Sequence, residues 1–415
     1  MNILIISSER LHPQNTFASI FELSQAKAIS KKNVKVKILS IYELNTFNLI
    51  FALFKKVTKR YNDIANRFSY LALLKYLIFS FINNRTLIKY HKIQQVDVIE
   101  GIGVTSIYNL IFRYKFGITW TQHGIKVFKD LNNYHEKFNL IHAHSRFLKA
   151  GLLASEIKRT YNTPYLITEH SSFLFKNKIP RNIINSLKNV YENASLIIAV
   201  SQTLINTINT KIKCSTKIVL IPNILDDKFE KIDINEKKET SNFKFVNVGS
   251  LLPIKNHKLL IDAYKLICNK NIDLTIVGNG PLLNELKQYS TNIPNIIFKG
   301  SLSNSEVLET LSNSHAFILS SKNETFGVSI IEALSCGLPV ISTKSGGPEF
   351  IITKNNGLLV DNNNPISLSN AMLELIKNYD IYNALDIRNE CIKNYGINTF
   401  TNRIIPIYNT MLQIV

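Results

Sequence analysis

One segment, residues 316–343, constrains the fold more than any other part of the chain. The short, continuously apolar run Ala316–Ser320 predicts a buried strand. Apolar side chains then recur at helical spacing over Val328–Leu334, and Gly337–Pro339 ends that helix. A second apolar run, Val340–Ser342, follows at once. A strand, a helix and a strand in this order predict a parallel sheet of the α/β class.

Two glutamates lie at the junction between this strand and this helix. Glu324 falls in the loop at the carboxyl end of the strand, and Glu332 falls about one turn into the helix. Helical side chains lean toward the N-terminus, so Glu332 can reach the same opening. The N–H groups of Phe326, Gly327 and Val328 would favour an anion there, such as phosphate. The alternative is that both acids only stabilise the helix dipole.

The segment 316–350 resembles the E-x7-E motif of retaining glycosyltransferases with the GT-B fold, in particular those of glycosyltransferase family four. This resemblance implies an α/β fold of two Rossmann-like, doubly wound domains that face a cleft. It also implies that Glu324 contacts the donor sugar and that Glu332 binds the ribose hydroxyls of the nucleotide.

The alternation of apolar runs and helical patterns predicts two successive βα domains. We expect an N-terminal domain at 1–222, a linker at 223–243, a C-terminal domain at 244–385 and a last helix at 386–415 that crosses back to the first domain. By resemblance, the first domain binds the acceptor and the second binds the nucleotide sugar. The expected strands are 3–7, 34–39, 97–100, 118–121, 140–144, 165–168, 196–200, 218–222, 244–248, 274–277, 296–299, 316–320 and 340–342.

The net charge of +19 belongs to the first half of the chain. Residues 1–222 hold 31 Lys and Arg against 11 Asp and Glu, whereas residues 223–415 hold 18 against 19. An insert at about 43–95 concentrates basic and aromatic residues, a composition typical of an amphipathic helix at an anionic membrane surface. The alternative is a helical insertion packed on the first domain. Nucleic acid is disfavoured because no binding module accompanies the charge.

The cysteines and the N-terminal residues indicate the cellular compartment of the protein. The four cysteines have no metal-type spacing, which predicts thiols in a reducing compartment. The opening residues lack the basic region of a signal peptide, and no apolar run reaches the length of a membrane span. We therefore expect a cytoplasmic protein, peripheral on the inner face of the cell membrane.

Further motifs extend the resemblance into the start of the second domain. Val248–His257 is similar to the family's V-G-R-L-x-x-x-K-G turn, which implies phosphate contacts by Lys255 and close backbone approach at Gly249. Ser250 stands where the family has an arginine. Gly300 falls in a segment that resembles the one lying along the nucleobase.

Histidines end two of the apparent parallel strands, where such folds bind ligands. The resemblance places His170 beside the donor sugar, with His144 and His123 as further cleft candidates. In the N-terminal loop, Ser19 replaces the glycine at which the family's backbone meets donor and acceptor.

The chain has no D-x-D pair, which argues against the metal-dependent GT-A type. We therefore expect no cofactor and no essential metal. The expected reaction is transfer of a hexose from a nucleotide diphosphate sugar, UDP being favoured, to a lipid-linked or glycan acceptor in cell-surface polysaccharide synthesis. Two alternatives stay open: a UDP-N-acetylglucosamine 2-epimerase, and a degenerate transferase retained as a membrane-associated partner.

Overall fold

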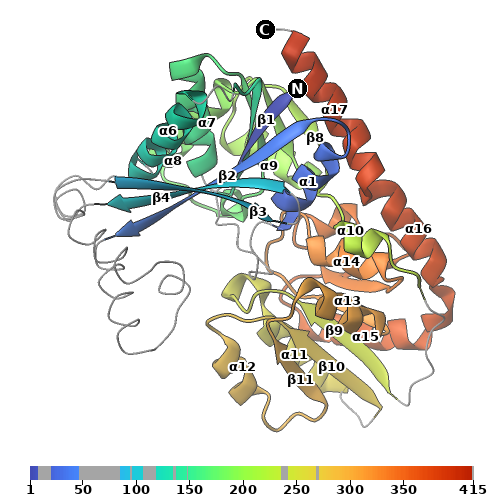
Figure 1. The fold of residues 1–415 in the computed structure, drawn as a ribbon. Coiled ribbons are helices and arrows are strands. Elements are labelled where there is room, and N and C mark those ends of the chain that lie inside the picture. The colour runs from blue at the N-terminus through green and yellow to red at the C-terminus, as the bar shows by residue number, and fades with distance from the viewer. Residues whose placement is uncertain are drawn as a thin grey trace, which may run out of the picture.

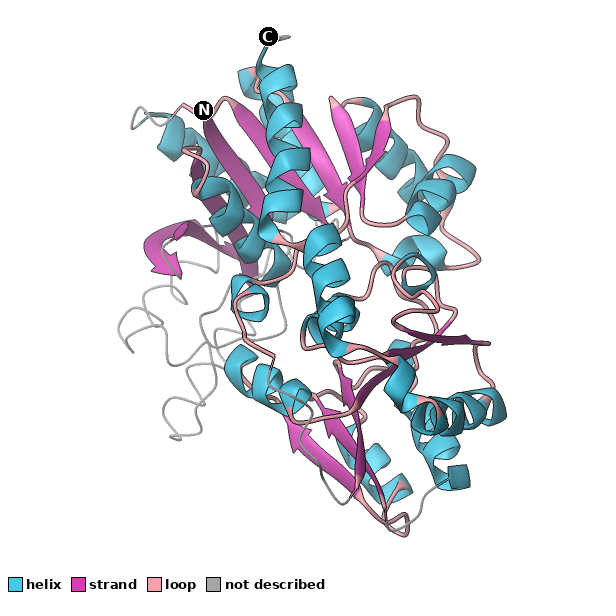
Figure 2. Ribbon diagram, turned by 90° about the vertical axis from the view of Figure 1, so that its right-hand side faces the viewer, coloured by secondary structure: helices cyan, strands magenta, loops and turns pink. Residues whose placement is uncertain are grey.

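The computed structural model describes residues 1–7, 20–45, 85–93, 96–105, 118–133, 137–146, 148–234, 242–267 and 271–413. Two α/β domains lie one above the other, each a mainly parallel sheet with helices on its faces (Figure 2). The predicted fold class is therefore confirmed.

The first sheet has eight strands in the order β3-β4-β2-β1-β5-β6-β7-β8. All pairs are parallel except β3–β4. The central strands are buried on both faces, which accounts for their unbroken apolar runs. The strands are β1 (Asn2–Ser7), β2 (Lys35–Asn45), β3 (Arg85–Ile93), β4 (Val96–Thr105), β5 (Leu140–Ser145), β6 (Tyr165–Glu169), β7 (Leu196–Ala199) and β8 (Ile218–Leu220).

The helices around this sheet connect its strands as crossovers. Helices α6, α7 and α8 lie together on one side of the sheet (Figure 1). The first-domain helices are α1 (Ile20–Ser30), α6 (Ile118–Asn133), α7 (Lys149–Tyr161), α8 (Arg181–Glu192), α9 (Gln202–Lys211) and the short 3₁₀ helix η1 (Ser172–Phe175).

Two predictions for this domain were wrong. Residues 118–121 are the start of helix α6, because the buried side chains that follow recur at spacings of three and four. Trp120 anchors this first turn by donating its indole N–H to Ile41 O at 2.8 Å. The insert at 43–95 was expected to be helical, but residues 85–93 form β3, which pairs antiparallel with β4. Residues 46–84 lie outside the described residues.

The second sheet has six parallel strands in the order β11-β10-β9-β12-β13-β14. The edge strand β14 was missed by the sequence analysis. The strands are β9 (Phe243–Val248), β10 (Ile272–Val277), β11 (Ile296–Gly300), β12 (Ala316–Leu319), β13 (Val340–Thr343) and β14 (Gly357–Val360). The helices are α11 (His257–Ile267), α12 (Leu283–Tyr289), α13 (Asn304–Ser312), α14 (Val328–Ser335), α15 (Pro365–Lys377), η2 (Pro253–Lys255), η3 (Pro348–Phe350) and η4 (Tyr379–Ile381).

This strand order reverses between β9 and β12. In doubly wound sheets, ligands bind outside the carboxyl ends of the strands at such a reversal. The loops that follow β9 and β12 carry the residues predicted for the phosphates and the sugar. The first sheet reverses between β1 and β5, and the loop after β1 lies outside the described residues.

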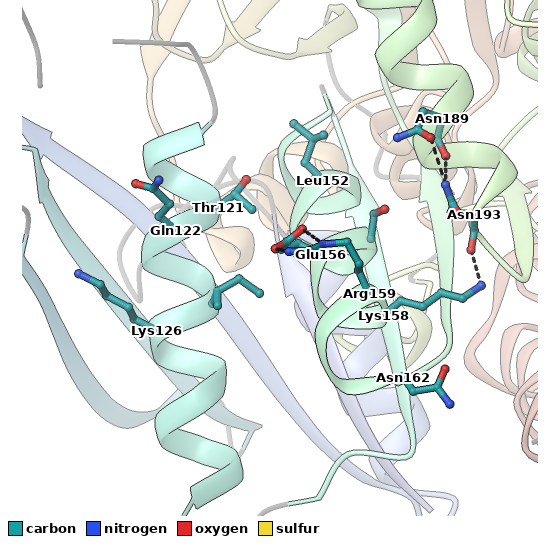
Figure 3. A pocket seen from close by; sticks show the side chains of 12 residues that line it. Thr121, Gln122, Lys126, Leu152, Glu156, Lys158, Arg159, Asn162, Asn189 and Asn193 are labelled. Carbon is teal, nitrogen blue, oxygen red and sulfur yellow. Dashed lines mark hydrogen bonds and ion pairs between the residues drawn. The ribbon is translucent and has the colours of Figure 1, made fainter. Parts of the chain in front are cut away.

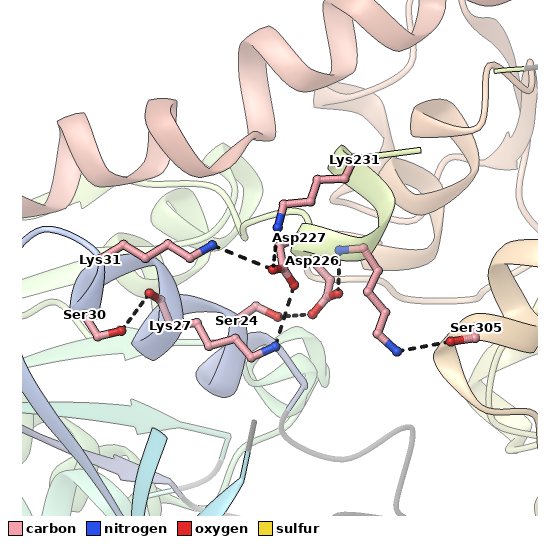
Figure 4. A network of polar contacts seen from close by, with 9 residues as sticks. Ser24, Lys27, Ser30, Lys31, Asp226, Asp227, Lys231 and Ser305 are labelled. Carbon is pink, nitrogen blue, oxygen red and sulfur yellow. Dashed lines mark hydrogen bonds and ion pairs between the residues drawn. The ribbon is translucent and has the colours of Figure 1, made fainter. Parts of the chain in front are cut away.

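The linker contains a short helix, α10 (Asp227–Glu230), and Lys228 of this helix donates to Ser305 Oγ of the second domain at 3.1 Å. Ser24 Oγ of α1 donates to Asp226 Oδ2 at 2.8 Å. Lys27 and Lys31 of α1 and Lys231 of the linker surround the Asp227 carboxylate at 3.5–3.7 Å (Figure 4). The start of the linker is thereby fixed to the first domain.

The C-terminal residues form two helices, α16 (Ala384–Tyr395) and α17 (Ile397–Gln413), which meet at Gly396. Helix α16 packs on α14 of the second domain, and α17 packs on α1 and on the inner residues of the first sheet (Figure 1). The chain therefore returns to the domain where it began. Among the described residues, no helix combines the length and the apolar character that a membrane crossing requires.

Candidate active site

A hollow of about 530 Å³ opens at the carboxyl ends of the strands, and both domains line it. The first domain contributes Arg146 and the segment His170–Phe173. The second domain contributes the loops after β9 and β12 and the first turns of α13 and α14. These second-domain residues are Val248, Gly249, Ser250, Ile254, Lys255, Asn304, Val307, Asn323, Glu324, Thr325, Phe326, Gly327, Val328, Ser329 and Glu332.

Glu324 is held by its backbone and its side chain. Its N–H donates to Ser345 O at 2.8 Å, and its carbonyl accepts from Gly347 N–H at 2.7 Å. Its carboxylate forms a short ion pair with the Lys255 ammonium group. The side chains of Glu324 and Lys255 are only 13% and 24% exposed, so Lys255 is not a solvated surface lysine. The predicted sugar-binding acid and the predicted phosphate-binding cation therefore form an ion pair with each other.

Helix α14 begins at Gly327, whose φ of +103° favours glycine. A Cβ there would also approach Ile330 Cδ1 to 2.9 Å. Phe326 is buried, and its ring packs edge-on against Tyr395 of α16 with 5.7 Å between centroids. Ile330 N–H donates to Gly327 O at 3.0 Å, so the N–H groups of Val328 and Ser329 are the first-turn donors of α14 that precede the intrahelical hydrogen bonds, and both residues line the hollow.

Glu332 lies deeper in the same hollow, in the second turn of α14. Desolvation and, to a smaller extent, the nearby charge of Asp226 together raise the pKa of its carboxyl group to about 8. The carboxyl group of Glu332 therefore carries its proton at neutral pH. It can then donate a hydrogen bond as well as accept one.

His170 faces the second domain from the end of β6, and its side chain is 8% exposed. Burial lowers its pKa well below the ordinary value, and the charge of Arg146 lowers it further. The imidazole is therefore neutral. Glu169 fixes the adjoining backbone by accepting the N–H groups of His170 and Ser171 at 3.0 and 2.7 Å.

Family models match both domains of the chain. Residues 227–395 match the model described as Glycosyl transferases group 1, and residues 94–229 match the one described as Glycosyltransferase Family 4. The chain is a GT-B glycosyltransferase of the family-four type.

Curated relatives agree with this assignment, and solved structures agree with the fold. The transferase is 29% identical to an uncharacterized glycosyltransferase of Methanocaldococcus jannaschii, over 67% of this chain and 77% of that protein. It is 27% identical to UDP-Gal:alpha-D-GlcNAc-diphosphoundecaprenol alpha-1,3-galactosyltransferase of Escherichia coli, over 67% and 76%. Its fold is similar to sucrose-phosphate synthase from Thermosynechococcus elongatus, with a TM-score of 0.72 and 16% identity over both complete chains. It is also similar to Anabaena Alr3699/HepE in complex with UDP, with a TM-score of 0.67 and 17% identity over 99% and 100%.

Some of the other predicted site residues of the transferase line the hollow, and the rest do not. Gly249, Ser250 and Val328 line the hollow. His144 is fully buried behind His170, and His123 is buried in α6. Gly300 is not among the lining residues, and Ser19 lies outside the described residues.

The glycine turn after β10 has a structural role in the transferase. Gly278 has a φ of +145°, and a Cβ there would overlap Gly249 O at 1.8 Å. Gly249 N–H donates to Val277 O, and Leu251 N–H donates to Asn279 O, both at 3.0 Å. The turn therefore supports the loop after β9. Around Gly249 itself, a Cβ would meet nothing within 4 Å, so that space is open to a ligand.

Sequence reasoning missed several lining residues of the transferase, among them Arg146 and Asn223. Arg146 comes directly after the histidine-ending strand β5, and this position was the signal that could have found it. It brings a second cation to the hollow, from the domain opposite Lys255. Within the described part of the chain, no group of three or more His, Cys, Asp or Glu could hold a metal ion.

A larger hollow, of about 1060 Å³, lies between the outer helices α6, α7 and α8 of the transferase. It holds none of the predicted site residues. Its lining is rich in amides and cations, including Gln122, Lys126, Lys158 and Asn162 (Figure 3). Arg159 on this surface is paired with Glu156. The hollow is therefore separate from the cleft and adds to the basic character of the first domain.

Proposed function

We propose that this enzyme transfers a hexose from a UDP-sugar, with retention of anomeric configuration, to a lipid-linked or glycan acceptor. The observation that carries the proposal is the convergence of Glu324, Lys255 and Glu332 at the strand reversal of the second domain, with His170 facing them. The name of the Escherichia coli relative, which gives a UDP-sugar donor and a diphosphoundecaprenol acceptor, supports the donor and acceptor classes.

The leaving diphosphate would be stabilised by Lys255 and by the first-turn N–H groups of α14. When the donor binds, Lys255 exchanges its Glu324 partner for phosphate oxygens. Glu324 is then released to accept hydrogen bonds from the sugar hydroxyls. Glu332 would bind the ribose hydroxyls.

In the transfer step, the bond between the anomeric carbon and the diphosphate oxygen breaks and the electron pair leaves with the phosphate. The acceptor oxygen forms its bond on the same face, and its proton passes to the departing phosphate. A neutral His170 suits a contact with an uncharged sugar hydroxyl. None of these groups has to be a metal ligand, so we propose that no divalent metal is essential.

The acceptor end of the reaction would take place at an anionic membrane surface. The support is the charge of the first half, with 31 basic against 11 acidic residues. Co-sedimentation with vesicles of phosphatidylglycerol and phosphatidylcholine at low salt tests this, with pure phosphatidylcholine as the control. Equal recovery in both pellets would remove the membrane from the proposal.

A thermal-shift screen of UDP, GDP, ADP and CMP, each with Mg²⁺ or with EDTA, tests the donor assignment. We expect UDP to raise the Tm in EDTA, because a ligand bound only by the native state stabilises it. NMR of the product made from the matching sugar nucleotide then reports its anomeric configuration. Stabilisation by none of the four would contradict the donor site. Conversion of UDP-N-acetylglucosamine without acceptor to its 2-epimer would favour an epimerase.

A further inference from the structure

A row of polar side chains crosses the buried layer between the first sheet and helix α17. His142 and His144 lie on β5, Thr168 lies on β6, and Tyr408 lies on α17. All four are at most 2% exposed. Around them this layer is apolar, so the row stands out as a buried polar feature that packing alone does not require.

Both ring nitrogens of His142 have partners. The Tyr408 hydroxyl lies 2.7 Å from His142 Nδ1, and Thr168 Oγ1 lies 2.7 Å from His142 Nε2. Burial lowers the pKa of His142 to about 3, so the ring is neutral and carries one N–H. One partner therefore donates to the ring and the other accepts from it. Either tautomer satisfies both hydroxyl partners, and the two contacts on opposite nitrogens fix the plane of the His142 ring.

The ring of His142 is in contact with the next histidine on the same face of β5. The centroids of His142 and His144 are 4.3 Å apart. His144 in turn stacks on His170, with 5.3 Å between centroids and 14° between planes. His144 Nδ1 and His170 Nε2 are 3.0 Å apart and share a hydrogen bond. The row therefore runs without a gap from α17 to the cleft.

We propose that Tyr408 is a positioning residue for His170, acting through His142 and His144. The inference rests on the proposed function, in which His170 contacts the donor sugar. By fixing the plane of His142, the Tyr408 hydroxyl holds the two rings stacked in front of it. The C-terminal helix thereby takes part in the active site, although its residues do not line the cleft.

Because the nucleotide and sugar contacts come from different domains, removing the Tyr408 hydroxyl should affect nucleotide binding and turnover differently. The nucleotide contacts proposed above come from the second domain, at Lys255, Glu332 and the start of α14. Tyr408 reaches only the sugar side, through the first domain. Loss of its hydroxyl should therefore lower kcat and leave nucleotide affinity unchanged.

The test is Y408F, which keeps the ring and removes the hydroxyl. Its matched control is Y264F, because the buried Tyr264 hydroxyl bonds to Ile272 O at 2.7 Å in the second domain. UDP affinity and the number of binding sites come from calorimetry. The rate of UDP release from UDP-glucose, UDP-galactose or UDP-N-acetylglucosamine is then expressed per UDP-binding site, which corrects for unfolded protein.

We expect Y408F to lower kcat about tenfold, the loss that one buried hydrogen bond corresponds to. The Kd for UDP and the KM for the donor should stay within twofold, and Y264F should match the wild type. The ¹⁵N side-chain resonances of His142 and His170 should both move in Y408F. T168V, which removes the partner on the opposite nitrogen, should show the same pattern and serves if Y408F does not fold.

Wild-type kcat in Y408F or in T168V would overturn the inference. So would a resonance change confined to His142, or a loss of UDP affinity in step with kcat. H170A separates this result from the proposed function. If H170A retains turnover, the role of His170 itself is wrong. If H170A is inactive while Y408F is normal, His170 keeps its proposed role, and only the positioning of His170 by Tyr408 is wrong.

Discussion

The two halves of the chain bring opposite kinds of chemistry to the cleft. Residues 1–222 carry all the excess positive charge, yet their central contribution to the cleft is the neutral His170, and Arg146 is the one cation that they add to the described lining residues. Residues 223–415 are close to neutral overall, yet they supply the ion pair of Lys255 and Glu324 and the acid Glu332. Net charge therefore does not mark where the charged site residues lie.

The comparison also separates two ways of holding a site residue. In the second domain, Glu324 is fixed by backbone hydrogen bonds to the loop after β13. In the first domain, His170 has a backbone hydrogen bond, to Ser145 O at 2.8 Å, and is otherwise held by the side chains of His144 and Glu169. The excess charge of the first domain is left for surfaces outside the donor site, such as the hollow between α6, α7 and α8.

The largest expected effect is that of E324A. Removing the carboxylate leaves Lys255 without its partner and leaves the sugar without an acceptor of hydrogen bonds. We expect turnover to fall by about 1000-fold or more, the scale of loss for a group that acts in the transition state. Steady-state UDP release measures it. The control is E285Q, an exposed glutamate of α12. Unchanged turnover in E324A would show that the donor sugar is not bound at Glu324.

Two glycine variants distinguish a glycine that supports the structure of the second domain from a glycine that leaves room for the nucleotide. In G278A, the new Cβ would overlap Gly249 O at 1.8 Å, in a backbone conformation that alanine avoids. We expect a loss of about 3 kcal/mol in the free energy of unfolding. In G249A, no protein atom lies within 4 Å of the new Cβ. The Tm should stay within about 1 °C while UDP affinity falls about tenfold.

Thermal unfolding and UDP calorimetry of both glycine variants check this. If G249A lowered the Tm and G278A lowered UDP affinity instead, the roles assigned to the two glycine turns would be wrong.

The sequence predicted the second domain better than the first. The segment 316–343 has both strand and helix periodicity, and each of its elements lies where expected. Residues 118–121 were misassigned because four residues of β-branched and aromatic character precede the buried positions that reveal the helical period. No local pattern indicated β14, because its burial alternates only weakly over four residues.

The site was predictable where one loop carries several of its residues, as Glu324 and Gly327 show. Arg146 was not predictable, because only the tertiary structure brings the end of β5 opposite the loop after β9. Tyr408 and His142 are 266 residues apart in the sequence, so no local sequence pattern could predict their contact.

The raised pKa of Glu332 gives a pH test of the second domain. A carboxyl group whose pKa is about 8 when folded and 4.5 otherwise binds a proton more tightly in the folded state. Wild-type stability therefore falls as pH rises from about 5 to 8, because the unfolded state ionises first. E332Q removes this loss, so its free energy of unfolding should exceed that of the wild type by an amount that grows over this window, to about 4 kcal/mol at pH 8. Scanning calorimetry at pH 5, 6.5 and 8 measures it, with E285Q as control. A difference that does not change with pH would show an ordinary carboxylate.

The smallest expected effect concerns Asp227, where the two halves are joined. Partial burial raises the pKa of its carboxyl group, but Lys27, Lys31 and Lys231 lower it by more, so the net shift is downward. Its stabilisation is therefore present above the unfolded pKa and is lost as pH falls through the lower folded value. D227N should lower the Tm by about 2 °C at pH 7 and low salt, and by less in 0.5 M NaCl, since partly exposed pairs are screened.

The matched control for Asp227 is D361N. Asp361 is paired with Lys344 at 2.8 Å, but its side chain is 71% exposed against 24% for Asp227. An exposed single pair stabilises little, so the Tm of D361N should equal that of the wild type. If D227N and D361N behaved alike, the lysines of α1 would be solvated charges of the basic half and would not fasten the linker. A Tm loss in D227N alone, reduced by salt, would show that part of the first domain's charge serves to hold the linker from which the second domain begins.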